Sequence, residues 1–156
     1  MKICVFSDSH GYAGNMIAAV EIEKPEICFF LGDGERDLVV LEEKYPDLPI
    51  YDVRGNCDFL SKANSVIVCD IDGVRIYVTH GHTDYVKFEP ELDTLTSRAV
   101  EAGADIALFG HTHRSHISSN RGVTLINPGS IGRGTYPSYA VIEIDSGKYS
   151  FDVRIV

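Results

Sequence analysis

The sequence has little that would place the protein in a membrane or outside the cell. None of its apolar runs approaches the roughly 18 residues of a membrane-spanning helix. The N-terminal apolar stretch is too short for a secretory signal and ends at Asp8. Its four cysteines form no Cys-x-x-Cys pair. We therefore expect a cytoplasmic protein with reduced thiols and no membrane partner.

Positive charge is also scarce. The 156 residues include 14 Lys and Arg against 23 Asp and Glu, a formal net charge of -9. Proteins that bind extended nucleic acid neutralise many phosphates with clustered basic side chains, so we expect no such partner here. A small phosphate-ester substrate remains compatible with this charge, because a bound divalent cation locally reverses the field that a phosphate meets. The sequence leaves a homo-oligomer open.

No linker, repeat or low-complexity segment divides the chain, so residues 1–156 are expected to form one domain. The hydrophobic patterns predict strands at 2–7, 27–31, 50–53 and 105–109 and helices near 12–23, 35–45 and 89–102. Two further strands flank the turn at 72–73, and short strands separated by turns follow Arg114. This order predicts an α/β fold with a parallel sheet in the first half and an antiparallel or mixed sheet in the second, packed face to face with helices outside.

Histidines gather after one of these strands. Residues 110–116, Gly-His-Thr-His-Arg-Ser-His, hold three of the six histidines. If the chain stays extended, alternate side chains share a face, so His111 and His113 would point together and His116 would face away. Two neutral imidazoles on one face suit a divalent metal, and Gly110 would relieve crowding beside them. A polar turn that happens to contain histidine is the alternative.

Polar residues follow five of the expected strands, in the segments 8–10, 32–34, 55–58, 80–82 and 110–113. Ligands bind beyond the carboxyl ends of strands in open α/β sheets, so we expect these segments to meet at one rim. The seven candidate metal ligands are Asp8, His10, Asp33, Asn56, His80, His111 and His113. Seven ligands are too many for one tetrahedral ion, so they predict two divalent ions bridged by Asp33. Mixed nitrogen and oxygen donors suit Mn, Fe, Ni or Zn.

The ordered motifs DSH (8–10), GD (32–33), GNCD (55–58), TH (79–80) and GHTH (110–113) resemble the pattern of the calcineurin-like metallophosphoesterases. The short chain and the cysteine in GNCD resemble the compact microbial branch often described as phosphodiesterases. The resemblance implies a four-layer α/β sandwich of two mixed sheets flanked by helices. It also implies two ions, one held by Asp8, His10, Asp33 and His113 and the other by Asp33, Asn56, His80 and His111.

Two such ions would lower the pKa of a bridging water, and the resulting hydroxide would attack phosphorus without a protein nucleophile. One departure concerns the leaving group. Many relatives have histidine where this chain has Cys57. That histidine, helped by the acidic residue after it, is held to stabilise the transition state or to protonate the leaving oxygen. Asp58 is present, but a thiol is a weak donor. His82, two residues beyond His80, is the candidate replacement, unless it only supports a ligand or lies on the surface.

A phosphodiester carries one negative charge fewer than a phosphomonoester dianion. A neutral thiol in an acidic chain offers little positive field for a dianion, so we expect a phosphodiesterase. Its expected catalytic residues are Asp33, Asn56, Cys57, Asp58 and His82. The alternatives are a phosphomonoesterase and a protein-binding scaffold that resembles the retromer subunit, although a scaffold has no physical need to gather seven ligands.

Three other features are weaker candidates for the mouth of the site. Arg36 follows the Gly-Asp motif and could meet a phosphate, although an arginine there is more often a solvated surface charge. Arg133 could do the same. Residues 127–130 could lie beside them, but the glycine among them favours a plain turn.

Overall fold

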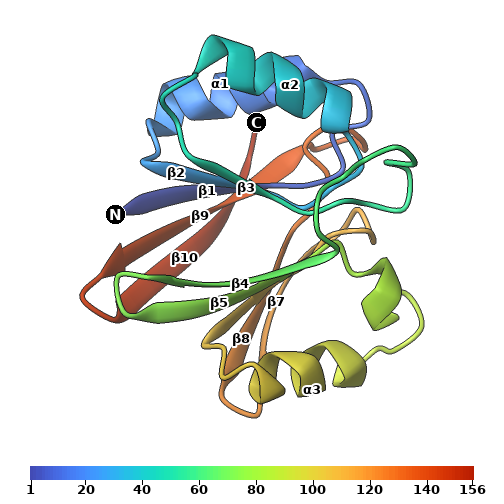
Figure 1. Ribbon diagram of the computed structural model, residues 1–156, viewed down its shortest axis with the longest axis vertical. Helices are drawn as coiled ribbons and strands as arrows, with labels where there is room; N and C mark the ends of the chain where they lie inside the picture. Colours follow the sequence, from blue (N-terminus) through green and yellow to red (C-terminus); the bar gives the residue numbers. More distant parts are fainter.

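The computed structural model describes all residues, 1–156, as two five-stranded β-sheets with three α-helices. In chain order the elements are β1 (Lys2–Phe6), α1 (Ala13–Glu23), β2 (Ile27–Phe30), α2 (Glu35–Lys44), β3 (Ile50–Asp52), β4 (Val66–Ile71), β5 (Val74–Thr79), the 3-10 helix η1 (His82–Asp84), α3 (Asp93–Glu101), β6 (Ile106–Leu108), β7 (Ser115–Asn120), β8 (Val123–Pro128), β9 (Ser138–Asp145) and β10 (Lys148–Ile155). The sheets pack face to face, with α1 and α2 on one outer side and α3 on the other (Figure 1). The expected four-layer sandwich is confirmed.

Both sheets mix parallel and antiparallel strands. The first has the order β10-β9-β1-β2-β3, in which β1, β2 and β3 are parallel because α1 and α2 return the chain between them. The hairpin of β9 and β10 adds to β1 antiparallel. The second has the order β4-β5-β6-β8-β7, with β5, β6 and β8 parallel and an antiparallel strand at each edge. The predicted turn at 72–73 connects β4 and β5, and the turns at 121–122 and 146–147 connect the short strands expected after Arg114.

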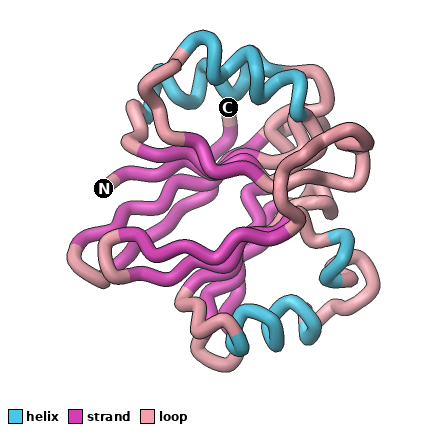
Figure 2. Tube along the Cα trace, viewed as in Figure 1, coloured by secondary structure: helices cyan, strands magenta, loops and turns pink.

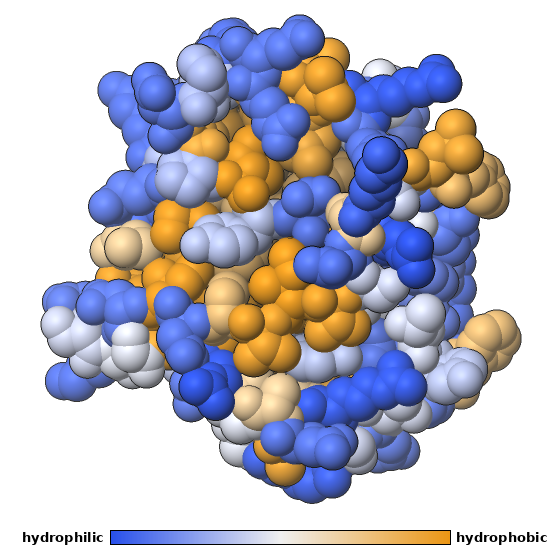
Figure 3. All heavy atoms as spheres, in the orientation of Figure 1, coloured by the Kyte–Doolittle hydropathy of each residue, from blue (hydrophilic) through white to orange (hydrophobic).

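Burial follows the period-two alternation of the strands. Ile3 and Val5 of β1 lie in the core between the two sheets, whereas Cys4 and Phe6 pack under α1 and α2. A third cluster, which includes Leu95, joins α3 to the second sheet. Apolar atoms appear between the mostly hydrophilic outer layers in the space-filling view (Figure 3). None of the helices is long and apolar enough to span a membrane.

The start of the third helix differs from the expectation. The sequence pattern predicts a helix from about residue 89, but α3 begins at Asp93. Leu92 has a φ of 53°, a left-handed conformation that an α-helix cannot contain. The Glu89 carboxylate instead accepts hydrogen bonds from the amide and hydroxyl of Thr94, at 2.8 and 2.7 Å. The residues before α3 therefore cap the helix rather than extend it.

The carboxyl ends of β1, β2, β3, β5 and β6 meet at one edge of the sandwich, where the loops gather (Figure 2). Backbone hydrogen bonds join neighbouring loops there. Asp8 N donates to Gly32 O at 2.9 Å, and Gly110 N donates to His80 O at 2.9 Å. The amide of His111 donates to Asp8 Oδ2 at 3.1 Å and so ties the loops of the two sheets together. Both sheets therefore contribute to one rim.

Candidate metal centre

The loops that carry the expected ligands adopt strained backbone conformations. Asp8, His10, Asp33, His111 and His113 all have positive φ, from 43° at His10 to 69° at His111. Residues other than glycine rarely occupy this left-handed region, and such strain clusters at functional sites, where the surrounding contacts hold it in place. Five of the seven expected ligands thus share a conformation that the packing of the rim has to impose.

These conformations correct the expected geometry of the histidine-rich loop. Residues 110–114 form no strand, so the prediction that His111 and His113 share an extended face is wrong. Thr112 N donates to Gly110 O at 2.8 Å and closes a tight turn instead. As a result, the two imidazoles belong to different groups of side chains.

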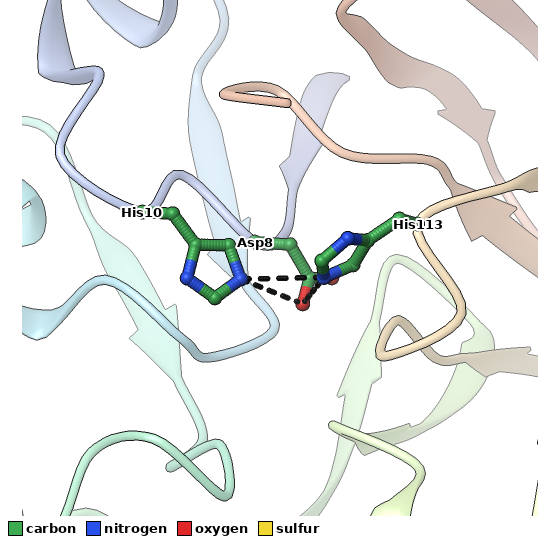
Figure 4. A group of neighbouring side chains, drawn as sticks. All are labelled: Asp8, His10 and His113. Carbon is green, nitrogen blue, oxygen red and sulfur yellow. Dashed lines mark hydrogen bonds and ion pairs between the residues drawn. The ribbon is translucent and has the colours of Figure 1, made fainter. Parts of the chain in front are cut away.

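The first group consists of Asp8, His10 and His113, whose polar atoms lie within 4.8 Å of one another. Asp8 Oδ1 lies 3.1 Å from His113 Nε2 and 3.7 Å from His10 Nε2, and the two Nε2 atoms are 3.2 Å apart (Figure 4). Burial alone would raise the pKa of Asp8, but the adjacent His113 and the charge of His80 favour the carboxylate and lower it. The three side chains therefore present their donor atoms to one spot.

The second group consists of Asp33, His80 and His111, with Asn56 beside them. His80 is fully buried, and its Nδ1 lies 2.6 Å from the carbonyl oxygen of Leu31. Donation to that carbonyl leaves Nε2 as the free lone pair, 3.4 Å from Asp33 Oδ2 and 3.0 Å from Asn56 Oδ1. Burial and the neighbouring His80 lower the pKa of His111 to about 4. Its ring is therefore neutral at pH 7 and can offer a lone pair.

Asp33 lies between the two groups. Its Oδ2 is 3.4 Å from His80 Nε2 and 3.8 Å from His10 Nε2. Its Oδ1 accepts a hydrogen bond from the amide of Cys57 at 2.8 Å. Burial would raise the pKa of Asp33, but His80 and the Cys57 amide hold it well below its usual range. One carboxylate oxygen thus faces an imidazole of each group.

The donor set fits divalent ions. Asp8 Oδ1 is buried without a hydrogen-bond partner, although buried polar atoms normally have one. Two imidazole nitrogens that each lie about 2.0–2.1 Å from one ion stand roughly 3 Å apart, and those of His10 and His113 are 3.2 Å apart. Both groups combine carboxylate and imidazole without thiolate. Such donors suit Mn, Fe, Ni or Zn.

Glycines let the ligand loops approach one another. A Cβ at Gly110 would meet Ser7 Oγ and would lie 2.9 Å from Asp8 Oδ2, so the expectation that Gly110 relieves crowding is confirmed. A Cβ at Gly32 would lie 2.7 Å from the Cα of Gly55. Any larger residue at either position would push a ligand loop out of place.

His82 lies beside both imidazoles of the second group. Its ring centre is 5.4 Å from that of His80 and 6.0 Å from that of His111. The chain does not continue extended from His80 to His82, because Gly81 has a φ of 109° and His82 begins η1. Its Nδ1 is buried without a hydrogen-bond partner. Burial and the charge of His80 lower the pKa of His82.

Cys57 and Asp58 have different surroundings. Cys57 is exposed, and partial burial of its thiol together with the charge of Asp33 raises its pKa, so the thiol is neutral. The Asp58 carboxylate accepts hydrogen bonds from four backbone amides and from no side chain. The thiol and the carboxylate therefore do not form an acid pair like the one that the family pattern implies for histidine and its acidic neighbour.

Two residues that sequence reasoning read as part of a turn support the ligand loops. Asn127 is buried, and its Nδ2 donates to Gly110 O and Thr112 Oγ1, each at 3.0 Å. The hydroxyl of Ser130 donates to the carbonyl of Asp8 at 2.7 Å. A signal was present, because both follow the apolar run of β8 just as the ligands follow theirs. The Pro-Gly pair between them favoured a plain turn instead.

The remaining candidates lie at the mouth or outside it. Arg36 lines a hollow of about 490 Å³ together with His10 and Cys57. Arg133 lines a separate hollow of about 680 Å³ that also borders His10. His116 bonds to Ser118 Oγ at 2.8 Å and belongs to neither ligand group, in line with its expected exclusion.

Comparison with known sequences gives one family. Residues 1–147 match the model of the calcineurin-like phosphoesterase superfamily domain. The chain is 33% identical over 151 residues to the probable metallophosphoesterase YsnB of Bacillus subtilis, an alignment that covers 94% of this chain and 86% of the relative. It is 29% identical over 147 residues to the phosphodiesterase MJ0936 of Methanocaldococcus jannaschii, with 83% of each chain covered.

Comparison with solved structures gives the same fold. A Streptococcus pneumoniae protein described as a predicted phosphoesterase superposes with a TM-score of 0.82 at 32% identity, over 99% of this chain and 88% of that one. Vps29 of Chaetomium thermophilum superposes with a TM-score of 0.78 at 19% identity, over 100% of this chain and 95% of that one. At that identity, the second similarity concerns the fold alone.

Proposed function

Because the chain belongs to the calcineurin-like phosphoesterase superfamily, as its motifs indicated, we propose that it is a phosphoesterase with two divalent ions that hydrolyses phosphodiesters. The position of Asp33 carries this proposal. One oxygen of its carboxylate faces His10 of the first group and His80 of the second. A bridging carboxylate is the feature that turns two neighbouring ligand groups into one dinuclear site.

Each ion would have four protein ligands. Asp8, His10, Asp33 and His113 would hold the first ion, and Asp33, Asn56, His80 and His111 would hold the second. When bound, the pair supplies Lewis acidity and activates water for attack on phosphorus. The identity of the ions among Mn, Ni, Fe and Zn is open to assay.

The protein's own residues prepare the donors. Donation from His80 Nδ1 to Leu31 O orients the ring so that Nε2 faces the second position. The lowered pKa of His111, about 4, keeps that imidazole unprotonated at neutral pH. The lowered pKa values of Asp8 and Asp33 keep both carboxylates charged. Binding of an ion at His111, Asp8 and Asp33 therefore competes little with protons, whereas the pKa of His80 is raised.

His82 is the proposed proton donor to the leaving oxygen. It lies beside His80 and His111, and its Nδ1 has no partner within the protein. Its lowered pKa makes the imidazolium a stronger acid, although a smaller fraction is protonated at neutral pH. The neutral thiol of Cys57 supports the preference for diesters, because it adds no positive charge for a monoester dianion.

A protein-binding scaffold is the second candidate, favoured by the fold similarity to Vps29. The exposed side chains of Phe59 and Leu60, which border the hollow beside the rim, would suit such a role. Against it, all seven ligand positions keep coordinating side chains, which a scaffold does not require.

The test is an ester screen on metal-stripped protein reconstituted with Mn, Ni, Fe or Zn. We expect two ions per chain and a higher kcat/KM for bis(p-nitrophenyl) phosphate than for p-nitrophenyl phosphate. A preference for the monoester would replace the diester proposal by the phosphomonoesterase alternative. Absence of turnover on both esters with every ion would favour the scaffold.

A further inference from the structure

Two carboxylates near the rim accept hydrogen bonds from the loops that carry the expected ligands and belong to neither ligand group. Asp37, in the first turn of α2, is buried. Asp58 lies on the loop after β3 and is half-buried. We infer that they are positioning residues that act on different ions, with Asp37 holding the loop of the first ion and Asp58 holding the loops of the second. This inference rests on the proposed two-ion function.

Asp37 accepts hydrogen bonds from the residues on both sides of His10. Its Oδ2 accepts hydrogen bonds from Ser9 Oγ at 2.6 Å and from Gly11 N at 2.8 Å. His10 lies between these two donors and has a φ of 43°. Since an anion accepts stronger hydrogen bonds than a neutral group, Asp37 can hold this strained residue in place.

Asp58 joins the two loops of the second group. Its Oδ2 accepts from Asp33 N and Gly55 N, each at 2.8 Å. Its Oδ1 accepts from Gly34 N at 3.1 Å and Glu35 N at 3.2 Å. The first amide belongs to the proposed bridging ligand, and Gly55 immediately precedes Asn56, a ligand of the second ion.

The same carboxylate also closes the start of α2. Gly34 precedes this helix and has no side chain to cap its free amides. Asp58 supplies a cap from a different loop, and its negative charge lies at the positive end of the helix. Asp58 can therefore cap α2 and hold the loops in place without a histidine at position 57.

The hydrogen bonds of the two carboxylates do not overlap. Asp37 accepts no hydrogen bond from residues 33 or 55–57, and Asp58 accepts none from residues 8–11. The two acids therefore act on separate sets of ligands, except that Asp33 is shared by both proposed ions. We expect an asymmetric result, in which loss of Asp37 weakens the first ion and loss of Asp58 weakens mainly the second.

The variants Asp37→Asn and Asp58→Asn keep the side-chain size and remove the anion. Partners that orient metal ligands typically contribute 10–100-fold in affinity. We expect Asp37→Asn to weaken the first ion by about that factor and to leave the second within about threefold. Asp58→Asn should weaken the second ion by the larger factor and the first ion less.

The measurement is calorimetric titration of metal-stripped protein with Mn²⁺, combined with anomalous diffraction from crystals at limiting Mn²⁺ to assign each occupancy to its position. Asp105→Asn is the matched control, because Asp105 Oδ2 also accepts a backbone amide, Arg75 N at 2.8 Å, but lies before β6 and away from the rim. This control should bind both ions as the wild type does.

The outcomes separate the two proposals. A wild type that binds fewer than two ions overturns the dinuclear function and this inference with it. A wild type with two ions, but variants that weaken both ions equally or neither, overturns the inference alone. If Asp37→Asn does not fold, Ser9→Ala removes one of its donors without changing charge and should weaken the first ion selectively. If Asp58→Asn does not fold, Asp58→Glu keeps the charge but lengthens the side chain, and it should displace the second ion more than the first.

Discussion

Two buried carboxylates of this chain, Asp8 at the rim and Glu23 at the end of α1, have opposite surroundings. Glu23 accepts hydrogen bonds from Arg154 at 2.6 Å, Tyr139 at 2.9 Å and Lys2 at 3.4 Å. Asp8 is fully buried, and its Oδ2 accepts hydrogen bonds from Ser7 Oγ and His111 N, but its Oδ1 accepts none. The cluster around Glu23 joins regular elements, whereas the rim contains residues in strained conformations. The difference is what the proposed metal site requires, because an unpaired buried oxygen and strained backbone cost stability that the rest of the fold offsets.

Among the variants of the rim and of the Glu23 cluster, Asp33→Ala should have the largest effect. It removes the carboxylate that is proposed to bridge the two groups, so we expect loss of at least one ion per chain. Bound metal ions lower the activation free energy of phosphoester hydrolysis by several kcal/mol, so kcat/KM should fall by about 10³-fold or more. Elemental analysis and diester kinetics measure the two effects. Asp47→Ala, at an exposed position without hydrogen-bond partners, is the control. Near wild-type turnover in Asp33→Ala would remove the bridging role.

The variant His82→Ala tests whether the second unpartnered atom at the rim, His82 Nδ1, serves in catalysis. General acid catalysis contributes typically about 10²–10⁴-fold where the departing oxygen needs a proton. We therefore expect a loss of about 10²-fold on an alkyl phosphodiester and a much smaller loss on the nitrophenyl diester. Equal losses on both substrates, with ion binding unchanged, would mean that His82 only supports its neighbours.

The variant Glu23→Gln should change stability and leave the rim intact. Loss of the anion weakens hydrogen bonds to Arg154 and Tyr139, but Arg154 is partly exposed and can regain water, so we expect a decrease of about 1–2 kcal/mol in the free energy of unfolding at pH 7. Ion binding should not change. Glu143→Gln, on an exposed side chain of β9, is the matched control. Weaker ion binding in Glu23→Gln would show that the two regions are coupled.

The same variant gives a pH dependence with a defined sign. Burial alone would raise the pKa of Glu23, but Arg154, Tyr139 and Lys2 lower it below its ordinary value of 4.5. The carboxylate therefore stabilises the fold fully above about pH 4.5, and this contribution is lost as the pH falls through the lowered pKa. Denaturant titrations should show the gap between wild type and Glu23→Gln closing below pH 4.5. A constant gap would contradict the charge argument.

The ligand loops were predictable because a short, local rule places them. An apolar strand followed by a polar residue puts that residue at the carboxyl edge, and this holds for Asp8, Asp33 and His80 without knowledge of distant contacts. The direction of each side chain was not predictable by periodicity. His111 and His113 turn to different groups because both residues adopt positive φ, which depends on packing against other loops.

The role of the residues that hold the expected ligands in place was not predictable from the sequence, for a related reason. Asp37 looks like an ordinary residue at the start of a helix, where acids are common, and Asp58 was expected as a catalytic residue beside Cys57 rather than as a residue that holds the loops. Most of their partners are backbone amides, and an amide has no signature in the sequence. The start of α3 depends in the same way on the left-handed conformation of Leu92, which its side chain does not predict.

The smallest expected effect concerns Cys57, the rim residue whose exposed thiol contributes neither charge nor a strong donor. Cys57→His would add a group that is partly cationic near neutral pH beside Asp33. One charge interaction in water is worth about 1 kcal/mol at ~4 Å, so the ratio of monoester to diester kcat/KM should rise by about fivefold. Cys57→Ser keeps the position neutral and should leave the ratio unchanged. An unchanged ratio in Cys57→His would mean that the proposed ions alone set the preference between ester classes, and that the position after Gly-Asn does not distinguish them.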